Sequence, residues 1–390
     1  MKIESLRIKN FKVFRDVEIR DIPNLAIFLG KNGTGKTTFF DVFGFLHDCL
    51  NSNVKMALVK RGGFREVISR EQSGDIEFVI KFRPAVNEPL ITYEVSIGLD
   101  HMNRAVVKKE KLRFRRGQKG SPWKVLDFAY GEGMAAAGTL SSYEDVSLAD
   151  RKPQRLDSPD ILAIKGLGQF SEFEAVSTFR RLIEDWYVSD FRIDAARDRQ
   201  EIEYSEHLSR TGDNLSSVTK YLYDNYPEKF NEIIEKMKER IPGVSSVEAQ
   251  ETQDGYIVLR FQDGKFKNPF SSKYVSDGTI KMFTYLVLLN DPTKHALLCV
   301  EEPENQLYPD LLEELAEEFR LYANNGGQVF VSTHSPDFLN AVQLDEIYYL
   351  EKENGFTTIK KASENKLVKS LCEAGELPGA LWKQGLLAEE

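Results

Sequence analysis

The strongest constraint on the fold is an eight-residue segment between an apolar run and a helical pattern. Residues 30–37 read Gly-Lys-Asn-Gly-Thr-Gly-Lys-Thr and match G-x-x-x-x-G-K-[ST] at every position. The apolar run Leu25–Leu29 before them is typical of a buried strand, and residues 37–50 carry apolar side chains at helical spacing. A strand that turns at glycines into a helix predicts an α/β domain with a phosphate-binding loop at this turn.

The residue types in this loop suit the phosphates of a nucleotide. Glycine allows positive φ and lets backbone N–H groups approach phosphate oxygens, and the following helix adds its positive end. Lys36 can reach the β- and γ-phosphates, and the hydroxyl of Thr37 can bind Mg²⁺. A chance glycine-rich turn is the alternative, which the strand and the helix on either side make less favourable. The candidate ATP-binding residues of the loop are Gly30, Asn32, Gly33, Gly35, Lys36, Thr37 and Thr38.

Two carboxylates follow a second apolar strand pattern. Residues 296–300 are all apolar, and Glu301 and Glu302 come directly after them. At such a strand end, Glu301 can support Mg²⁺ directly or through water, and Glu302 can act as the general base on the attacking water. A solvated acidic loop is the alternative, but a phosphate loop already requires an acidic strand end of this kind.

Two further segments complete the candidate site. His334, one of five histidines, ends a strand pattern thirty-two residues after Glu302 and could bond a γ-phosphate oxygen or the catalytic water. Ser276 and Gly278 precede a predicted helix, whose N-terminus favours an anion. The alternatives are a capping or core histidine and an ordinary helix N-cap.

In this order and spacing, the four segments resemble the ATP-binding cassette (ABC) superfamily. More closely they resemble the SMC-, RecF- and OLD-like ATPases, in which they are the Walker A loop, the signature motif, Walker B and the H-loop. The resemblance covers residues 2–50 and 271–351. It implies an α/β fold with an ABC-type P-loop ATPase head, Mg²⁺ as the cofactor, and hydrolysis of ATP to ADP and phosphate.

The same resemblance implies a homodimer in a head-to-tail arrangement. Ser276 and Gly278 of one copy would complete the γ-phosphate site that Lys36, Thr37 and Glu302 of the other copy build. One departure is that Glu301 stands where many ABC proteins have Asp.

The hydrophobic period divides the rest of the chain. From about residue 75 to 127 the pattern alternates and predicts an antiparallel β lobe, and residues 130–159 read as a loop. Helices are expected over 170–187 and 214–239, and a hairpin over 244–258. The expected organisation is an ATPase core at 1–60 plus 265–358, the β lobe at 61–130, a flexible loop with a mixed helical and β insertion at 131–264, and a C-terminal tail at 359–390 that packs on the core.

Composition limits the location and the partners. Three widely spaced cysteines and no apolar run long enough for a bilayer predict a cytoplasmic protein without a membrane partner. A net charge of −9 lowers the expectation of nucleic-acid binding. A local basic strand still leaves DNA possible: Lys111, Arg113 and Arg115 share one face, with Lys108, Lys109, Arg116 and Lys119 nearby. A solvated outer strand face explains this pattern equally well.

Three hypotheses for function remain open. The first is a nucleotide-gated homodimer that regulates a separate effector, a nuclease or a toxin, in bacterial antiviral defence; this setting is implied by the resemblance alone. The alternative is a RecF- or SMC-like ATPase that acts directly on DNA in repair or recombination. The third is a chain that binds ATP but hardly turns it over, against which Glu302 argues.

Overall fold

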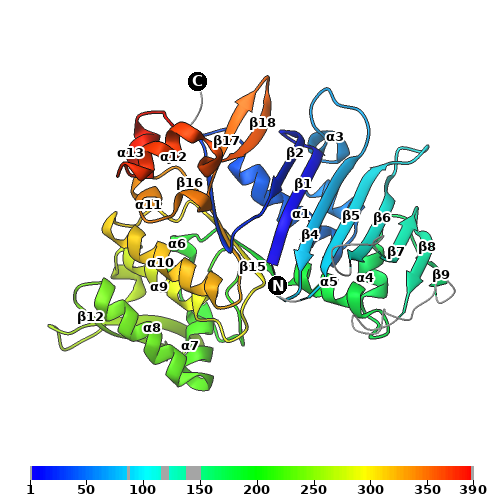
Figure 1. Ribbon diagram of the computed structural model, residues 1–390. Coiled ribbons are helices and arrows are strands. Elements are labelled where there is room, and N and C mark those ends of the chain that lie inside the picture. The colour runs from blue at the N-terminus through cyan, green and yellow to red at the C-terminus, as the bar shows by residue number, and fades with distance from the viewer. Residues whose placement is uncertain (1, 86–87, 116–122, 138–150, 388–390) are drawn as a thin grey trace. The chain divides into compact units, whose positions relative to one another are not determined.

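The computed structural model describes residues 2–85, 88–115, 123–137 and 151–387. The chain divides into two compact units. Unit 1 contains Met1–Trp186 and Asp345–Lys369, and unit 2 contains Tyr187–Leu344 and Ser370–Glu389. Figure 1 shows the elements of both units, coloured along the chain.

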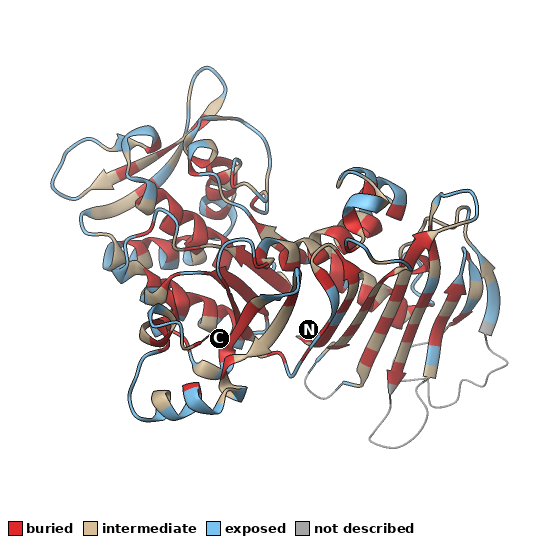
Figure 2. Cartoon of the chain, turned by 90° about the horizontal axis from the view of Figure 1, so that it is seen from above, coloured by how far each residue is buried: buried red, intermediate tan, exposed pale blue. Residues whose placement is uncertain are grey.

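Unit 1 is built on an eight-stranded antiparallel sheet of order β2-β1-β4-β5-β6-β7-β8-β9. Along β4, Phe78, Ile80 and Phe82 are buried and alternate with partly exposed residues, and the same alternation runs along the neighbouring strands in Figure 2. This confirms the antiparallel lobe expected over residues 75–127. The strands are β1 (Lys2–Phe11), β2 (Phe14–Arg20), β4 (Ile76–Arg83), β5 (Leu90–Leu99), β6 (Ala105–Arg115), β7 (Trp123–Ala129), β8 (Glu132–Ala136) and β9 (Arg151–Arg155).

The prediction of a loop over residues 130–159 is wrong at residues 132–136 and 151–155, which form β8 and β9. Small residues weakened the strand signal in β8, but the close approach of β7 requires them. A Cβ on Gly133 would lie 2.2 Å from the carbonyl oxygen of Asp127. Tyr130 and Gly131, both at positive φ, make the tight turn between the two strands. The part of the expected loop at 138–150 lies outside the described residues.

The phosphate-loop segment of unit 1 forms a smaller sheet with helices. Strand β3 (Leu25–Leu29) pairs in parallel with β17 (Ile347–Glu353), which pairs with β18 (Phe356–Lys361) in antiparallel fashion. Helix α1 (Lys36–Asn51) buries one broad apolar face, and its Phe39 ring lies 4.2 Å from that of Phe28 on β3. The other helices are α2 (Val54–Val59), α3 (Phe64–Val67), α4 (Ala163–Leu167) and α5 (Glu174–Glu184).

Unit 2 contains the second strand pair of the site. Strand β15 (Leu297–Glu301) pairs in parallel with β16 (Val329–Thr333), and helices α9 (Asp277–Leu289), α10 (Asp310–Asn324) and α11 (Pro336–Asn340) belong to the same unit. Its other elements are β10 (Trp186–Ser189), whose last three residues belong to unit 2, α6 (Ile193–Arg197), β11 (Gln200–Glu201), α7 (Leu215–Asn225), α8 (Pro227–Arg240), β12 (Val244–Glu251), β13 (Tyr256–Asp263), β14 (Phe270–Ser271) and α13 (Pro378–Lys383). Helix α12 (Lys366–Glu373) runs from one unit into the other.

The expected hairpin is confirmed by β12 and β13, whereas the single helix expected over 214–239 is two helices. Pro227 is the first residue of α8, where its missing N–H costs nothing, and Tyr226 before it leaves the helical conformation. Within the described part of the chain, no helix combines the length and the apolar character needed to cross a bilayer.

A buried carboxyl group links the large sheet of unit 1 to helix α4. Glu110 on β6 is 1% exposed and accepts hydrogen bonds from the hydroxyl of Tyr93 and the backbone N–H groups of Ala163 and Ile164. Burial raises the pKa of Glu110 to about 7, although these three hydrogen bonds favour the carboxylate.

The stability of the chain should therefore depend on pH through Glu110. Its pKa is raised on folding from 4.5 to about 7, so its contribution is fully present below pH 4.5 and is lost as the pH rises through 7. Relative to Glu110→Gln, we expect the free energy of unfolding of the wild type to fall by about 2 to 3 kcal/mol from pH 5 to pH 8. Urea denaturation at both pH values measures this difference. Glu172→Gln, at an exposed site of unit 1, is the control, and a pH-independent difference for Glu110→Gln would contradict the expectation.

Candidate functional site

The phosphate loop in unit 1 is shaped by its glycines. Gly33 and Gly35 have φ values of 80° and 103°, which other residues rarely adopt. A Cβ on Gly35 would also lie 2.7 Å from a methyl group of Val13. The hydroxyl of Thr34 donates to the carbonyl of Lys31 (2.8 Å), and Thr357 on β18 donates to the carbonyl of Thr34 (2.6 Å). The loop is therefore held closed before helix α1 begins.

Lys36 and Thr37 stand at the first turn of α1, where the helix leaves backbone N–H groups without helical partners. Lys36 is 7% exposed, and its Nζ donates to the carbonyl oxygen of Gly30 at 2.8 Å. The ammonium group is thus held against the first residue of the loop. Thr37, Asn32 and Gly33 are exposed, and Thr38 is half-buried. This arrangement offers N–H groups, one ammonium and one hydroxyl to a phosphate chain.

In unit 2, Glu302 follows β15 in a strained backbone conformation. Its φ is 42°, a region that residues other than glycine seldom occupy. Its N–H donates to the carbonyl of Ser332 at 2.9 Å. One side-chain oxygen accepts from the amide of Asn305 at 3.1 Å, and the other lies 3.4 Å from Nδ1 of His334. The side chain is 31% exposed, so the carboxylate is oriented by its neighbours and still reaches solvent.

Glu304 connects the loop after β15 to the loop after β16, a role that sequence analysis did not assign. Its Oε1 accepts from the hydroxyl of Thr333 at 2.7 Å and from the N–H of His334 at 2.9 Å. The same oxygen is 3.3 Å from Nδ1 of His334. The His334 ring therefore lies beside both Glu302 and Glu304, and its donor and acceptor roles depend on its protonation. The sequence signal that could have indicated this role of Glu304 is its position as an acidic residue two places after Glu302.

The C-terminal helix of unit 2 contacts the same histidine. Nε1 of Trp382 on α13 donates to the carbonyl oxygen of His334 at 3.2 Å. Gly379 donates to the side chain of Asn340 at 2.9 Å, and a Cβ on Gly379 would lie 2.0 Å from the carbonyl of Pro336. Trp382 is thus a packing residue of the His334 loop, which no sequence motif indicated.

Ser276 is the N-cap of α9, and its hydroxyl is used within the helix. It accepts from the N–H of Thr279 at 3.3 Å and lies 2.7 Å from the hydroxyl of Thr279. Gly278 follows in the first turn, where a Cβ would meet the carbonyl oxygen of Gln306 at 3.0 Å. Both residues are at least partly exposed at the helix N-terminus. The capping geometry of the alternative interpretation is present, and it leaves the N-terminus accessible to an anion.

The predicted site residues therefore form two groups. Residues 30–38 lie together in unit 1, and Glu301, Glu302 and His334 lie together in unit 2 with Ser276 and Gly278 on α9. Glu301 ends β15 opposite Ser332 and is partly exposed. Thr37 and Glu301 offer hydroxyl and carboxylate oxygens, which are the donors that Mg²⁺ prefers.

The basic strand face on β6 is neutralised by neighbouring carboxylates. Lys108 pairs with Asp75 at 2.8 Å and Lys111 with Asp127 at 3.2 Å. Lys109 and Arg113 both pair with Glu94. These cations are therefore occupied within the sheet, which favours the solvated strand face over a track for phosphates. Residues Arg116 and Lys119 lie outside the described residues.

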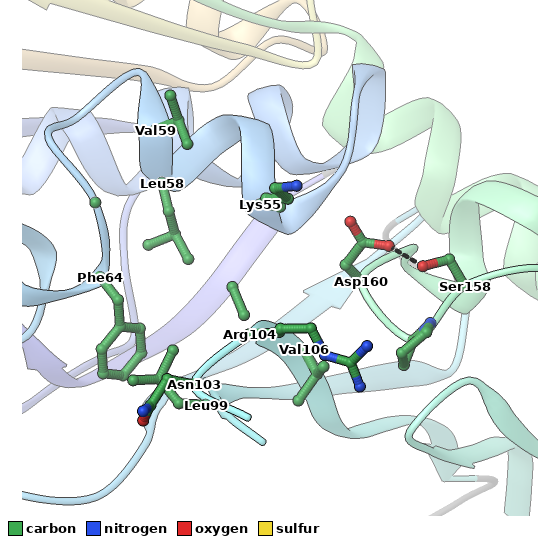
Figure 3. Close-up of a pocket in the computed structure, with 13 residues that line it drawn as sticks. Lys55, Leu58, Val59, Phe64, Leu99, Asn103, Arg104, Val106, Ser158 and Asp160 are labelled. Carbon is green, nitrogen blue, oxygen red and sulfur yellow. Dashed lines mark hydrogen bonds between the residues drawn. The ribbon is translucent and has the colours of Figure 1, made fainter. Parts of the chain in front are cut away.

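Unit 1 also has a pocket of about 420 Å³ whose lining contains no predicted site residue. Figure 3 shows Leu58, Phe64 and Leu99 among its apolar residues, with Arg104 and Asp160 among the polar ones. Arg104 forms an ion pair with Asp100, and Ser158 donates to Asp160. Arg104 and Asp160 are thus engaged by neighbouring side chains.

The fold is that of an ABC-type ATPase head of the SMC- and RecF-like group. The model of the family described as "AAA domain, putative AbiEii toxin, Type IV TA system" matches residues 25–340. The chain belongs to this family.

Two solved structures share the fold at low sequence identity. The SMC head bound to the C-terminal winged-helix domain of ScpA has a TM-score of 0.53 and 14% identity, over 92% of this chain and 98% of that one. The Smc head domain with an extended coiled coil, bound to the C-terminal domain of ScpA derived from Pyrococcus furiosus, has a TM-score of 0.52 and 14% identity, over 96% and 99% of the two chains. At this identity the likeness concerns the fold.

Curated relatives match a shorter segment. The DNA replication and repair protein RecF of Porphyromonas gingivalis is 34% identical over 96 residues, which is 23% of this chain and 26% of that protein. RecF of Lactococcus lactis subsp. cremoris is 41% identical over 46 residues, or 12% of this chain and 13% of that protein. The matches thus span a minor part of either relative.

Proposed function

We propose that the chain binds and hydrolyses ATP as an ABC-type ATPase. The observation that supports this most directly is the setting of Glu302. A strained backbone, the amide of Asn305 and the ring of His334 orient a carboxylate that stays partly exposed. Strain and fixed orientation at one polar side chain are typical of functional sites. Neither the backbone strain nor the fixed orientation of Glu302 would be expected in a solvated acidic loop.

In the proposed mechanism, Lys36 and the N–H groups of the loop bind the β- and γ-phosphates, and the hydroxyl of Thr37 and the carboxylate of Glu301 hold Mg²⁺. The ion would neutralise charge that develops on the phosphates. Glu302 acts as the general base that orients and deprotonates the attacking water. His334 senses the γ-phosphate by a hydrogen bond from its ring.

We propose further that two copies face each other head to tail. Ser276 and Gly278, at the N-terminus of α9, would then contact the ATP bound by the partner copy. Such a dimer is stable only while ATP fills both sites, so hydrolysis would switch it between two states. The likeness of the fold to SMC heads supports the arrangement.

Mixing two inactive variants tests the head-to-tail dimer. Lys36→Ala and Ser276→Arg each damage a different half of the site, so each alone should be inactive. Heterodimers would contain one intact site, and an equimolar mixture should regain about a quarter of the wild-type rate. Phosphate release after mixing measures the recovery.

The matched control is a mixture of Lys36→Ala and Glu302→Gln. Both positions belong to the same half of the proposed site, so no heterodimer has an intact site and the mixture should stay inactive. Recovery in the control, or no recovery in the first mixture, would contradict the head-to-tail arrangement.

We propose that this switch regulates a separate effector, a nuclease or a toxin, in bacterial antiviral defence. A setting in a system of two components draws support from the family description, which names a putative toxin of a type IV toxin–antitoxin system. The paired cations of β6 also make that face less suited to DNA. The alternative, direct action on DNA in repair or recombination, draws on the RecF relatives. An ATP-dependent complex with a second protein would favour the effector, and turnover stimulated by duplex DNA would favour the alternative.

A further inference from the structure

A buried lysine on the signature helix reaches the loop that carries Glu302. Lys281 lies one turn into α9 and is 4% exposed. Its Nζ donates to the backbone carbonyl oxygen of Asn305 at 2.5 Å and lies 5.9 Å from the centre of the Tyr285 ring. Both contacts lie within unit 2.

An apolar side chain would fill this position without the cost of burying a charge. Burial lowers the pKa of Lys281 to about 8, while the charges of Glu304 and Glu302 favour its ammonium form. The side chain of Glu304 is 9% exposed, and its buried Oε2 lacks a hydrogen-bond partner within the described residues. The buried ammonium of Lys281 and the carboxylate of Glu304 therefore both lie close to the Asn305 segment.

The same segment contacts α9 at a second point. A Cβ on Gly278 would lie 3.0 Å from the carbonyl oxygen of Gln306, so the first turn of the helix packs closely on this backbone. The two contacts lie three residues apart on α9 and on adjacent carbonyl groups of the loop. The loop therefore touches the helix at two points.

Asn305 passes this constraint to Glu302. Its backbone oxygen accepts from Lys281, and its side-chain amide donates to Oε2 of Glu302 at 3.1 Å. The N–H of Asn305 also donates to the carbonyl of Glu302 at 3.1 Å and closes a tight turn.

We infer that Lys281 is a positioning residue for hydrolysis, because it holds Asn305 where the amide orients the carboxylate of Glu302. This inference rests on the proposed function, in which Glu302 is the general base. In the proposed dimer, the N-terminus of α9 faces the nucleotide of the partner copy. Lys281 connects this helix to the carboxylate of Glu302, which acts on the chain's own nucleotide. A movement of α9 caused by ATP in one site would then reorient Glu302 in the other site.

The test compares Lys281→Met, which keeps the side-chain length, with Lys281→Arg, which keeps the donor. We expect Lys281→Met to lower kcat for Mg-ATP by at least about tenfold and to change KM by less than about threefold. Lys281→Arg should recover part of the loss. Lys273→Met, at an exposed lysine just before α9, is the control and should behave like the wild type.

Hydrogen exchange of the peptide that covers residues 303–307, measured without nucleotide, provides a readout independent of activity. In Lys281→Met its amides should exchange at least about threefold faster, while the rest of unit 2 is unchanged. A wild-type chain that does not hydrolyse ATP would sink the proposed function, and the exchange experiment would still decide whether Lys281 fixes the loop. Unchanged exchange, or an unchanged kcat in an active chain, would overturn the inference. If Lys281→Met does not fold, Lys281→Gln replaces it in both measurements, with the same outcomes.

Discussion

Replacing Glu302 by Gln should lower kcat for Mg-ATP hydrolysis by at least about 100-fold and leave ATP binding intact. Glutamine keeps the size of the side chain and can still pair with Asn305, but it cannot accept the proton of the attacking water. Because the backbone at residue 302 is fixed by Ser332 and by its own turn, the substitution should not move the loop. Phosphate release and nucleotide binding, measured with and without duplex DNA, separate the two effects.

Glu317→Gln, at an exposed carboxylate on α10, is the matched control and should keep wild-type turnover. Equal rates for the wild type and Glu302→Gln would remove Glu302 from the mechanism and leave a nucleotide-binding module. Turnover that depends on Glu302 and ignores DNA would support a gated partner. Turnover that rises with DNA and depends on Glu302 would move the assignment to the DNA-acting alternative.

Lys36→Ala should abolish ATP binding at micromolar concentrations, with a loss of affinity of at least about 100-fold. The side chain supplies the one ammonium group that the loop holds at its first residue, and a charge-assisted hydrogen bond to phosphate contributes more than a neutral one. Titration of a fluorescent ATP analogue against the full chain measures the affinity.

The control for Lys36 is Lys352→Ala, which removes an exposed lysine from unit 1 and should bind as the wild type does. Thermal unfolding without nucleotide should be similar for both variants, since the hydrogen bond from Lys36 to the carbonyl oxygen of Gly30 lies within the loop itself. Unchanged affinity in a folded Lys36→Ala variant would contradict the assignment of residues 30–37 as the nucleotide loop.

Much of the fold was predictable because the motifs lie where the hydrophobic period changes. The strand at 25–29, the helix that follows it and the strands expected over 296–300 and 328–332 are present, the last two displaced by one residue. Each is an apolar run bounded by glycine or polar residues, so local pattern and burial agree. The β8 strand was missed because small residues that permit close packing also resemble a loop.

The roles of the candidate residues could be inferred from motifs, but the geometry of these residues could not be inferred from the sequence. No sequence pattern indicates that Glu304 bridges to His334 or that Trp382 bonds the carbonyl of His334, because both contacts join segments distant in the chain. Lys281 likewise reads as one lysine in an apolar helix. Its partner becomes visible only when the loop after β15 packs against α9.

The hydrogen bond from Trp382 to the carbonyl of His334 gives the chain a built-in optical probe. The other two tryptophans, Trp123 and Trp186, belong to unit 1, so replacing both with Phe would leave one indole in the whole protein. The emission wavelength of an indole follows the polarity and hydrogen bonding around its nitrogen. Fluorescence from this single residue would report the conformation of the histidine loop in real time, without an added dye.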